Sequence, residues 1–162
     1  MVYEFDIPGL QMHELDTFTD ERGVLVPSLR DIEFDAKESY TSITWPGFGR
    51  GMHYQDGQAK MVVLIDGYIT DYVIDLRRDS PTYLHYAELT LSSQIRRALV
   101  IPANCAHGFI AREKSVVQYF MNTKFESWKY KGINMRCITD EVMNLSNKDA
   151  TLPIINVKGR VY

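Results

Sequence analysis

Long apolar runs are absent from this sequence, and so are basic clusters. One of the longest runs, MVVLI at 61–65, is far shorter than the roughly 20 residues that a membrane-spanning helix needs. A net charge of -3 without lysine- or arginine-rich segments gives no support to a nucleic-acid partner. The first ten residues carry acids where an export signal would carry basic residues. We therefore expect a cytoplasmic protein with no membrane segment.

Cysteine and histidine are scarce, which limits disulfide and metal chemistry. The 2 cysteines, Cys105 and Cys137, are too few for a disulfide framework and are expected to be free thiols. Cys105 and His107 would share a face of a strand, but no residue nearby would orient the histidine for a thiol nucleophile. The 4 histidines lack ligand-like spacing, because residues 53–55 read HYQ where a jelly-roll metal site has His-x-His. We expect no metal.

The periodicity that is present is mostly that of strands. Segments rich in β-branched and aromatic residues alternate with Pro-Gly, Asp-Gly and Asp-Ser-Pro turns and are found at 40–45, 61–76, 84–91, 98–102 and 116–123. A helix is predicted only at 139–145, where Thr139 would be its cap. No linker or repeat divides residues 1–162, so we expect a single all-β domain, a sandwich or jelly-roll barrel, with a short C-terminal helical segment.

A polar approach to one predicted strand is the first candidate site. In RGMHYQDGQAK, residues 50–60, a hairpin at QDGQ would fold Lys60 back towards His53, close to Arg50. Cations gathered in a cavity suit an anionic ligand or a developing oxyanion. The alternative is that His53 is structural and that Arg50 and Lys60 are solvated residues of a sheet edge.

A second candidate is the acidic residue of LSNKD, residues 145–149. Asp149 would raise the basicity of His53 and make it a general base if the two side chains met. In isolation, Asp149 could equally cap a turn. The sequence alone does not decide between these roles.

Five motifs, taken in order, resemble the dTDP-4-dehydrorhamnose 3,5-epimerase family, a branch of the cupin superfamily. They are DERG at 20–23, RGMHYQ at 50–55, QAK leading into LIDGYITDYVIDLRRDSPTY, IPANCAHGF at 101–109 and LSNKD. The resemblance covers about four-fifths of the chain. It implies a cupin double-stranded β-helix and an epimerisation without a cofactor, in which a proton is removed next to the ketone of a nucleotide-linked 4-keto-6-deoxysugar and returned on the other face.

The resemblance also assigns roles to residues. It implies that His53, paired with Asp149, is the base and that Lys60 stabilises the enolate. Binding roles near the substrate fall to Arg50 and Gln55 in RGMHYQ, to His107 in AHGF, and to Arg22, which in the family often reaches the diphosphate of a partner subunit. It further implies a homodimer that exchanges N-terminal strands.

Departures from the family pattern concern the acid and the recognition residues. The family acid, a tyrosine about thirteen residues after the AHGF histidine, aligns with Phe120, and the neighbouring Tyr119 would need a slip of one residue. Glu38 and Tyr40 replace a glutamine and an asparagine, and Pro27 replaces a glutamate. An altered acid predicts epimerisation at a single carbon. Two alternatives remain: a keto-sugar isomerase working through the same enolate, and a sugar-nucleotide-binding protein without activity.

Overall fold

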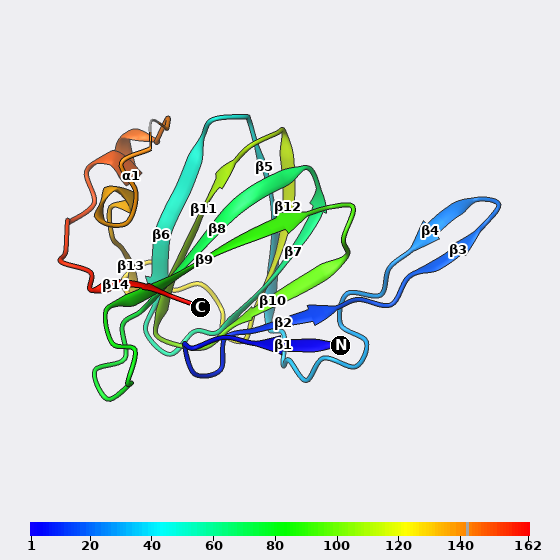
Figure 1. Ribbon diagram of the computed structural model, residues 1–162, viewed down its shortest axis with the longest axis horizontal. Helices are drawn as coiled ribbons and strands as arrows, with labels where there is room; N and C mark the ends of the chain where they lie inside the picture. The colour runs from blue at the N-terminus through cyan, green and yellow to red at the C-terminus, as the bar shows by residue number, and fades with distance from the viewer. Residues whose placement is uncertain (142) are drawn as a thin grey trace.

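Two antiparallel sheets face each other and form a jelly-roll barrel (Figure 1). The computed structural model describes residues 1–141 and 143–162. The first sheet contains, in spatial order, β1 (Val2–Glu4), β2 (Gln11–Glu14), β10 (Arg97–Ile101), β7 (Lys60–Asp66), β12 (Ser115–Met121) and β5 (Glu38–Thr44). The second contains β13 (Tyr130–Gly132), β6 (Gly49–Gln55), β11 (Cys105–Ala111), β8 (Tyr68–Asp75), β9 (His85–Ser92) and β14 (Gly159–Val161). Of these pairings only that of β14 with β9 is parallel. The expected all-β jelly roll is confirmed.

Burial of alternate residues holds the two sheets together. Apolar side chains from both sheets meet in one core between them, and this core includes Val62, Val73, Leu99, Phe109 and Val117. Burial of one such side chain contributes about 1.5–3 kcal/mol. The core fills the end of the barrel near β8, β9 and β10. The other end, between β6 and β11 on one side and β5 and β12 on the other, carries polar residues instead.

A second apolar cluster explains why the C-terminal segment covers the outside of the second sheet. Met52 and Ile74 on the outer face of this sheet pack against Ile133, Met135 and Met143. Among the described residues of this segment, helical structure is limited to a 3-10 turn η1 (Met135–Cys137) and one helical turn α1 (Asn147–Ala150). The helix predicted at 139–145 is wrong for its described residues, which are irregular, while Val142 lies outside them. The helical turn forms later because Ser146 accepts the backbone N–H of Asp149 as an N-cap.

Several strands carried no clear signal. Strand β6 contains two glycines and four polar residues, so apolar and polar residues hardly alternate along it. It nevertheless forms part of the wall of the barrel. Strands β1, β3 (Phe18–Asp20), β4 (Gly23–Leu25), β13 and β14 have only three residues each. Such strands are set by pairing with neighbours rather than by their own propensity.

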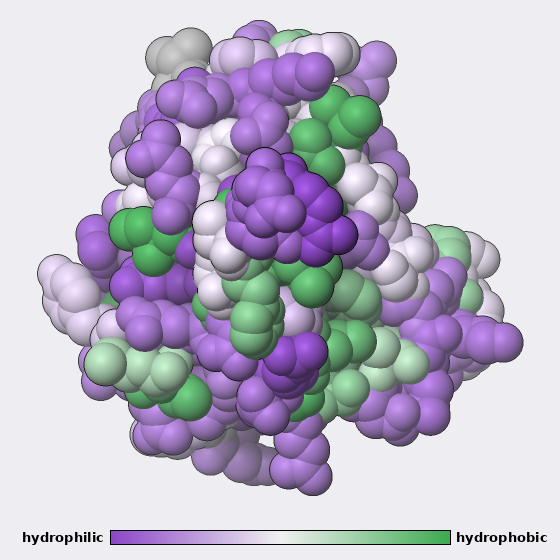
Figure 2. Space-filling view, turned by 90° about the vertical axis from the view of Figure 1, so that its right-hand side faces the viewer, coloured by the Kyte–Doolittle hydropathy of each residue, from purple (hydrophilic) through white to green (hydrophobic). Residues whose placement is uncertain are grey.

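The hairpin of β3 (Phe18–Asp20) and β4 (Gly23–Leu25) projects away from the barrel (Figure 1). Its apolar side chains are exposed: Phe18 by 47%, Val24 by 56% and Leu25 by 66%. On the side of the molecule towards which this hairpin projects, apolar surface lies beside strongly hydrophilic surface (Figure 2). We call residues 18–25 the arm. Among the described residues only Arg30, whose guanidinium lies 5.0 Å from the centroid of the Phe18 ring, stacks on an aromatic side chain of the arm, and an isolated two-stranded hairpin is poorly stabilised alone.

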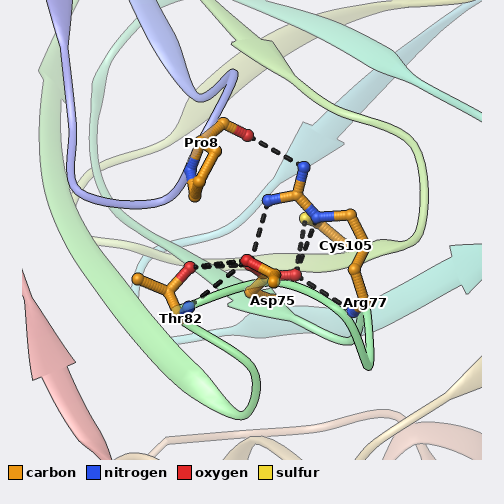
Figure 3. Close-up of polar contacts among 6 residues, drawn as sticks. Pro8, Asp75, Arg77, Thr82 and Cys105 are labelled. Carbon is orange, nitrogen blue, oxygen red and sulfur yellow. Dashed lines mark hydrogen bonds and ion pairs between the residues drawn. The ribbon is translucent and has the colours of Figure 1, made fainter.

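A buried carboxylate fixes the loop that follows β8 (Figure 3). Asp75 is fully buried and accepts hydrogen bonds from Arg77, Ser80 and Thr82. Burial alone would raise the pKa of Asp75, but these hydrogen bonds lower it to about 2. Arg77 also donates to the carbonyl of Pro8, so the same carboxylate ties the N-terminal turn to the barrel. No helix among the described residues is long and apolar enough to cross a membrane.

Candidate active site

The structure brings His53 and Asp149 together, although 96 positions separate them. His53 Nε2 lies 2.6 Å from Asp149 Oδ1. The side chain of Asp149 is only 7% exposed, and that of His53 is 21% exposed. Burial alone would raise the pKa of Asp149, but hydrogen bonds from His53 and from the Gly51 N–H lower it. A carboxylate held ionised against an imidazole fixes its tautomer and stabilises the imidazolium, as a general base requires.

Backbone geometry places Asp149 at this point. The α1 turn is anchored by Asn134, whose side-chain nitrogen donates to the carbonyl of Ala150. The second carboxylate oxygen of Asp149 accepts the N–H of Gly51 at 3.1 Å. Gly51 has φ +107°, and a Cβ there would lie 2.6 Å from the carbonyl of His107. Only glycine therefore allows β6 to approach β11 this closely while its N–H points to the carboxylate.

Lys60 lies at the start of β7 and is buried, with its Nζ donating to the carbonyl of His53 at 3.1 Å. Burial lowers the pKa of Lys60 to about 8, against an opposing effect of nearby Asp71. The ammonium is thus mostly charged at neutral pH, and it lines the same cavity as His53. A desolvated ammonium beside the base is suited to a developing enolate oxygen.

Tyr119, and not Phe120, points into the cavity. Tyr119 lies 3.1 Å from the hydroxyl of Ser42 and lines the cavity. Burial raises the pKa of Tyr119 to about 12, so the phenol keeps its proton at neutral pH. Phe120 packs against a separate apolar cluster on the outer face of the first sheet, with Met61 and Val63. The expectation that Phe120 occupies the acid position is corrected, because neighbouring strand residues face opposite ways and residue 119 has the inward phase.

A second histidine–carboxylate pair lies deeper in the barrel. His107 Nε2 is 2.8 Å from Asp71 Oδ2, and both side chains are buried. Burial raises the pKa of Asp71, with His107 and Lys60 acting in the opposite direction. The sequence interpretation missed Asp71. The sequence feature that could have identified Asp71 is a carboxylate at an inward position of GYITDYVID. It lies between Ile69 and Val73, both of which belong to the core.

These residues line one cavity of about 230 Å³. Its wall carries His53, Lys60, His107 and Tyr119, together with Tyr40, one of the departures from the family pattern. Four further residues line it that received no role from the sequence: Ser42, Gln58, Phe125 and Tyr130. Arg50 also lines it and donates to Thr44 and to the carbonyl of Ile43.

Two predicted binding residues are not in this cavity. Gln55 is buried, and its side chain bonds to Thr123, the Lys124 carbonyl and the Glu126 N–H, so it supports the segment beside the cavity. Arg22 lies at the tip of the arm, paired with Asp20 and 84% exposed. Within one chain, Arg22 therefore lies away from the cavity.

Metal binding depends on whether ligand side chains converge, and thiol reactivity depends on the surroundings of the cysteine. Within residues 1–141 and 143–162, no three His, Cys, Asp or Glu side chains converge as metal ligands would. Cys105 is buried beside Asp75, and burial raises its pKa to about 12, so its thiol stays protonated.

Comparisons with known proteins find relatives of the same fold along most of the chain. The family model described as dTDP-4-dehydrorhamnose 3,5-epimerase matches residues 4–156. A dTDP-4-dehydrorhamnose 3,5-epimerase of Shigella flexneri is 30% identical over 91% of this chain and 92% of its own length. Among solved structures, an epimerase of Mycobacterium tuberculosis superposes with a TM-score of 0.87 at 27% identity, covering 95% of this chain and 88% of its own. A dTDP-4-dehydrorhamnose 3,5-epimerase of Sulfolobus tokodaii superposes with a TM-score of 0.85 at 28% identity, covering 95% of this chain and 96% of its own.

Proposed function

The chain belongs to the dTDP-4-dehydrorhamnose 3,5-epimerase family, and on that premise we propose that it epimerises a nucleotide-linked 4-keto-6-deoxysugar at carbon next to the ketone. The chain is thus an isomerase. A solved relative from Legionella pneumophila, 25% identical, holds dTDP-4-keto-L-rhamnose, which supports a dTDP-sugar as the substrate.

The proposed reaction moves one proton off the sugar and one proton on. His53, held by Asp149, takes the proton from carbon next to the ketone, and the electron pair moves onto the carbonyl oxygen. The ammonium of Lys60 stabilises that enolate oxygen. Tyr119 then donates its phenolic proton to the opposite face of the carbon, and solvent restores the protonation of His53 and Tyr119.

The single observation that supports this proposal is the placement of His53 and Tyr119 on opposite walls of the cavity. His53 lies on β6 of the second sheet, and Tyr119 lies on β12 of the first, with the cavity between them. Inversion needs removal and return of the proton on opposite faces, which this arrangement permits. With Tyr119 facing the cavity, the argument for restriction to a single carbon loses its basis, since it depended on Phe120.

We also propose that two copies associate by exchanging their arms. The exposed apolar residues of the arm and the open edge strand β5, where Tyr40 and Ile43 are 41% and 53% exposed, support this pairing. Arg22 at the arm tip would then reach the partner's substrate diphosphate. Free cysteines Cys105 and Cys137 support a reducing, cytoplasmic location.

The test is conversion of dTDP-4-dehydro-6-deoxyglucose, followed by NMR of the sugar protons. Formation of a C3-, C5- or doubly inverted 4-keto sugar supports the proposal. A product whose carbonyl has moved to the neighbouring carbon would replace it with a keto-isomerase. Tight binding without any reaction, for this and other nucleotide-linked 4-keto sugars, would instead indicate a binding protein.

A further inference from the structure

Tyr130 is the aromatic neighbour of the base, and neither the sequence motifs nor the proposed reaction gives it a role. It lies on β13, which pairs with the outer edge of β6 so that Tyr130 is opposite Gln55 and Gly132 is opposite His53. Residues 53 and 55 share a face of β6, so Tyr130 is the diagonal neighbour of His53, within reach of a long side chain. The two ring centroids are 5.3 Å apart, with the planes tilted by 39°.

Two other side chains hold the Tyr130 ring in place. Phe125 meets it edge-on, with centroids 5.2 Å apart, an arrangement that aromatic pairs prefer. The Nζ of Lys148 lies over the ring, 5.0 Å from its centroid, as in a cation–π contact. Lys148 directly precedes Asp149 in α1, so adjacent residues of one helical turn hold the tyrosine and the base.

The hydroxyl of Tyr130 is not what ties this residue to the base. The described residues offer it no hydrogen bond, and its ring forms part of the cavity wall. Burial, with Asp149 and the phenols of Tyr119 and Tyr40 adding to it, raises the pKa of Tyr130 far above its usual value, so the phenol is neutral at working pH. The contact with His53 is made by the ring, and the ring is the part to test.

We propose that Tyr130 is a positioning residue of the base: its ring, held by Phe125 and Lys148, keeps the His53 imidazole aligned on Asp149 with its free nitrogen towards the substrate. Asp149 contacts a single ring nitrogen of His53 and leaves the imidazole free to tilt about that hydrogen bond. The tyrosine ring blocks this tilt. The effect on kcat rests on the proposed function. The alignment of the His53 ring on Asp149 does not, because it exists without substrate.

The kinetic test compares Tyr130→Leu with its conservative partner Tyr130→Phe. A misplaced catalytic group costs up to about 100-fold in rate, so Tyr130→Leu is expected to lower kcat between about 10- and 100-fold, with KM changed less than about threefold. Tyr130→Phe keeps the ring and is expected to restore kcat to within about threefold of the parent. Tyr83, whose ring is likewise covered by a lysine, Lys158, is the matched control, and Tyr83→Leu should leave kcat unchanged.

A double-mutant cycle separates positioning from a general loss of structure. Asp149→Asn weakens the other support of His53, so Tyr130→Leu should cost far less in that background than in the parent, because residues acting through one group are not additive. Additive losses would overturn the inference. A loss in Tyr130→Phe equal to that in Tyr130→Leu would also overturn it, since the hydroxyl would then be the active part.

An NMR measurement tests the alignment without turnover. The Nε2–H proton of His53, bonded to Asp149 and assigned by its loss in His53→Ala, should exchange with solvent faster in Tyr130→Leu than in the parent, and at the parent rate in Tyr130→Phe and Tyr83→Leu. An unchanged exchange rate in Tyr130→Leu would refute the inference whether or not that variant is active. If the parent converts no keto sugar but the exchange rates differ as expected, the proposed function fails while the positioning role stands.

Discussion

Replacing Lys60 by methionine should change both the activity and the stability of the protein, each with its own dependence on pH. A methionine side chain nearly keeps the length of the lysine and removes its charge. In the folded protein burial lowers the pKa of Lys60 to about 8 from 10.5. At about 1.4 kcal/mol for each tenfold change, burying the ammonium costs roughly 3 kcal/mol of folding free energy, an upper estimate for the replacement because Asp71 would lose its cationic neighbour.

The sign of the pH dependence follows from proton counting. Below pH 8 the folded and unfolded forms both carry the ammonium, so its cost is fully present. Between about pH 8 and 10.5 the unfolded form binds the extra proton, and stability therefore rises with pH. Lys60→Met is expected to be more stable than the parent at pH 7, by about 1–3 kcal/mol, and to lose that advantage towards pH 10.5.

The activity of the parent should have the opposite dependence on pH and fall where its stability rises. If the Lys60 ammonium stabilises the enolate, kcat/KM of the parent falls on the alkaline side with a midpoint near pH 8, and Lys60→Met loses about 100- to 1,000-fold, as for removal of one oxyanion donor. Urea denaturation at pH 7 and 10, and pH profiles of kcat/KM, measure these effects. Lys131→Met, at a half-exposed surface lysine, should show neither. An alkaline fall that persists unchanged in Lys60→Met would show that titration of Lys60 does not cause it.

Three further predictions follow from the described contacts. Tyr119→Phe should lower kcat by about 100- to 10,000-fold, the range for a general acid, whereas Phe120→Tyr should leave it unchanged; both are measured by NMR of turnover. Asp149→Asn should lower kcat with KM little changed, because it disturbs the alignment and charge of His53 without removing a cavity-lining group. Asp75→Ala should cost about 3–5 kcal/mol in urea denaturation, because it leaves the Arg77 guanidinium without its buried partner, and a cost below about 1 kcal/mol would contradict the fold description.

Motifs in the sequence were sufficient to predict the jelly roll and the pairing of His53 with Asp149. His53 and Asp149 were identified by resemblance, but their contact depends on the α1 turn, on Asn134 and on the close approach of β6 and β11 at Gly51. Such contacts are long-range, so local periodicity does not encode them.

The alignment placed Phe120 instead of Tyr119 on the cavity side of β12 for a physical reason. The face on which a strand residue lies depends on the number of residues in the preceding turn, here between β11 and β12, and an error of one residue reverses it. Asp71 was overlooked because one carboxylate in an apolar strand has no motif. Tyr130 was overlooked because β13 has only three residues, and its place is set by pairing with β6.

We propose that His53 removes a proton from carbon next to the ketone. The most direct test of this step is the exchange of that carbon-bound proton for deuterium when dTDP-4-dehydro-6-deoxyglucose is incubated with the protein in deuterated water. We predict exchange at C3, C5 or both with the parent protein, and a loss of at least about 1,000-fold with His53→Ala. Exchange by His53→Ala at the parent rate would show that His53 is not the base.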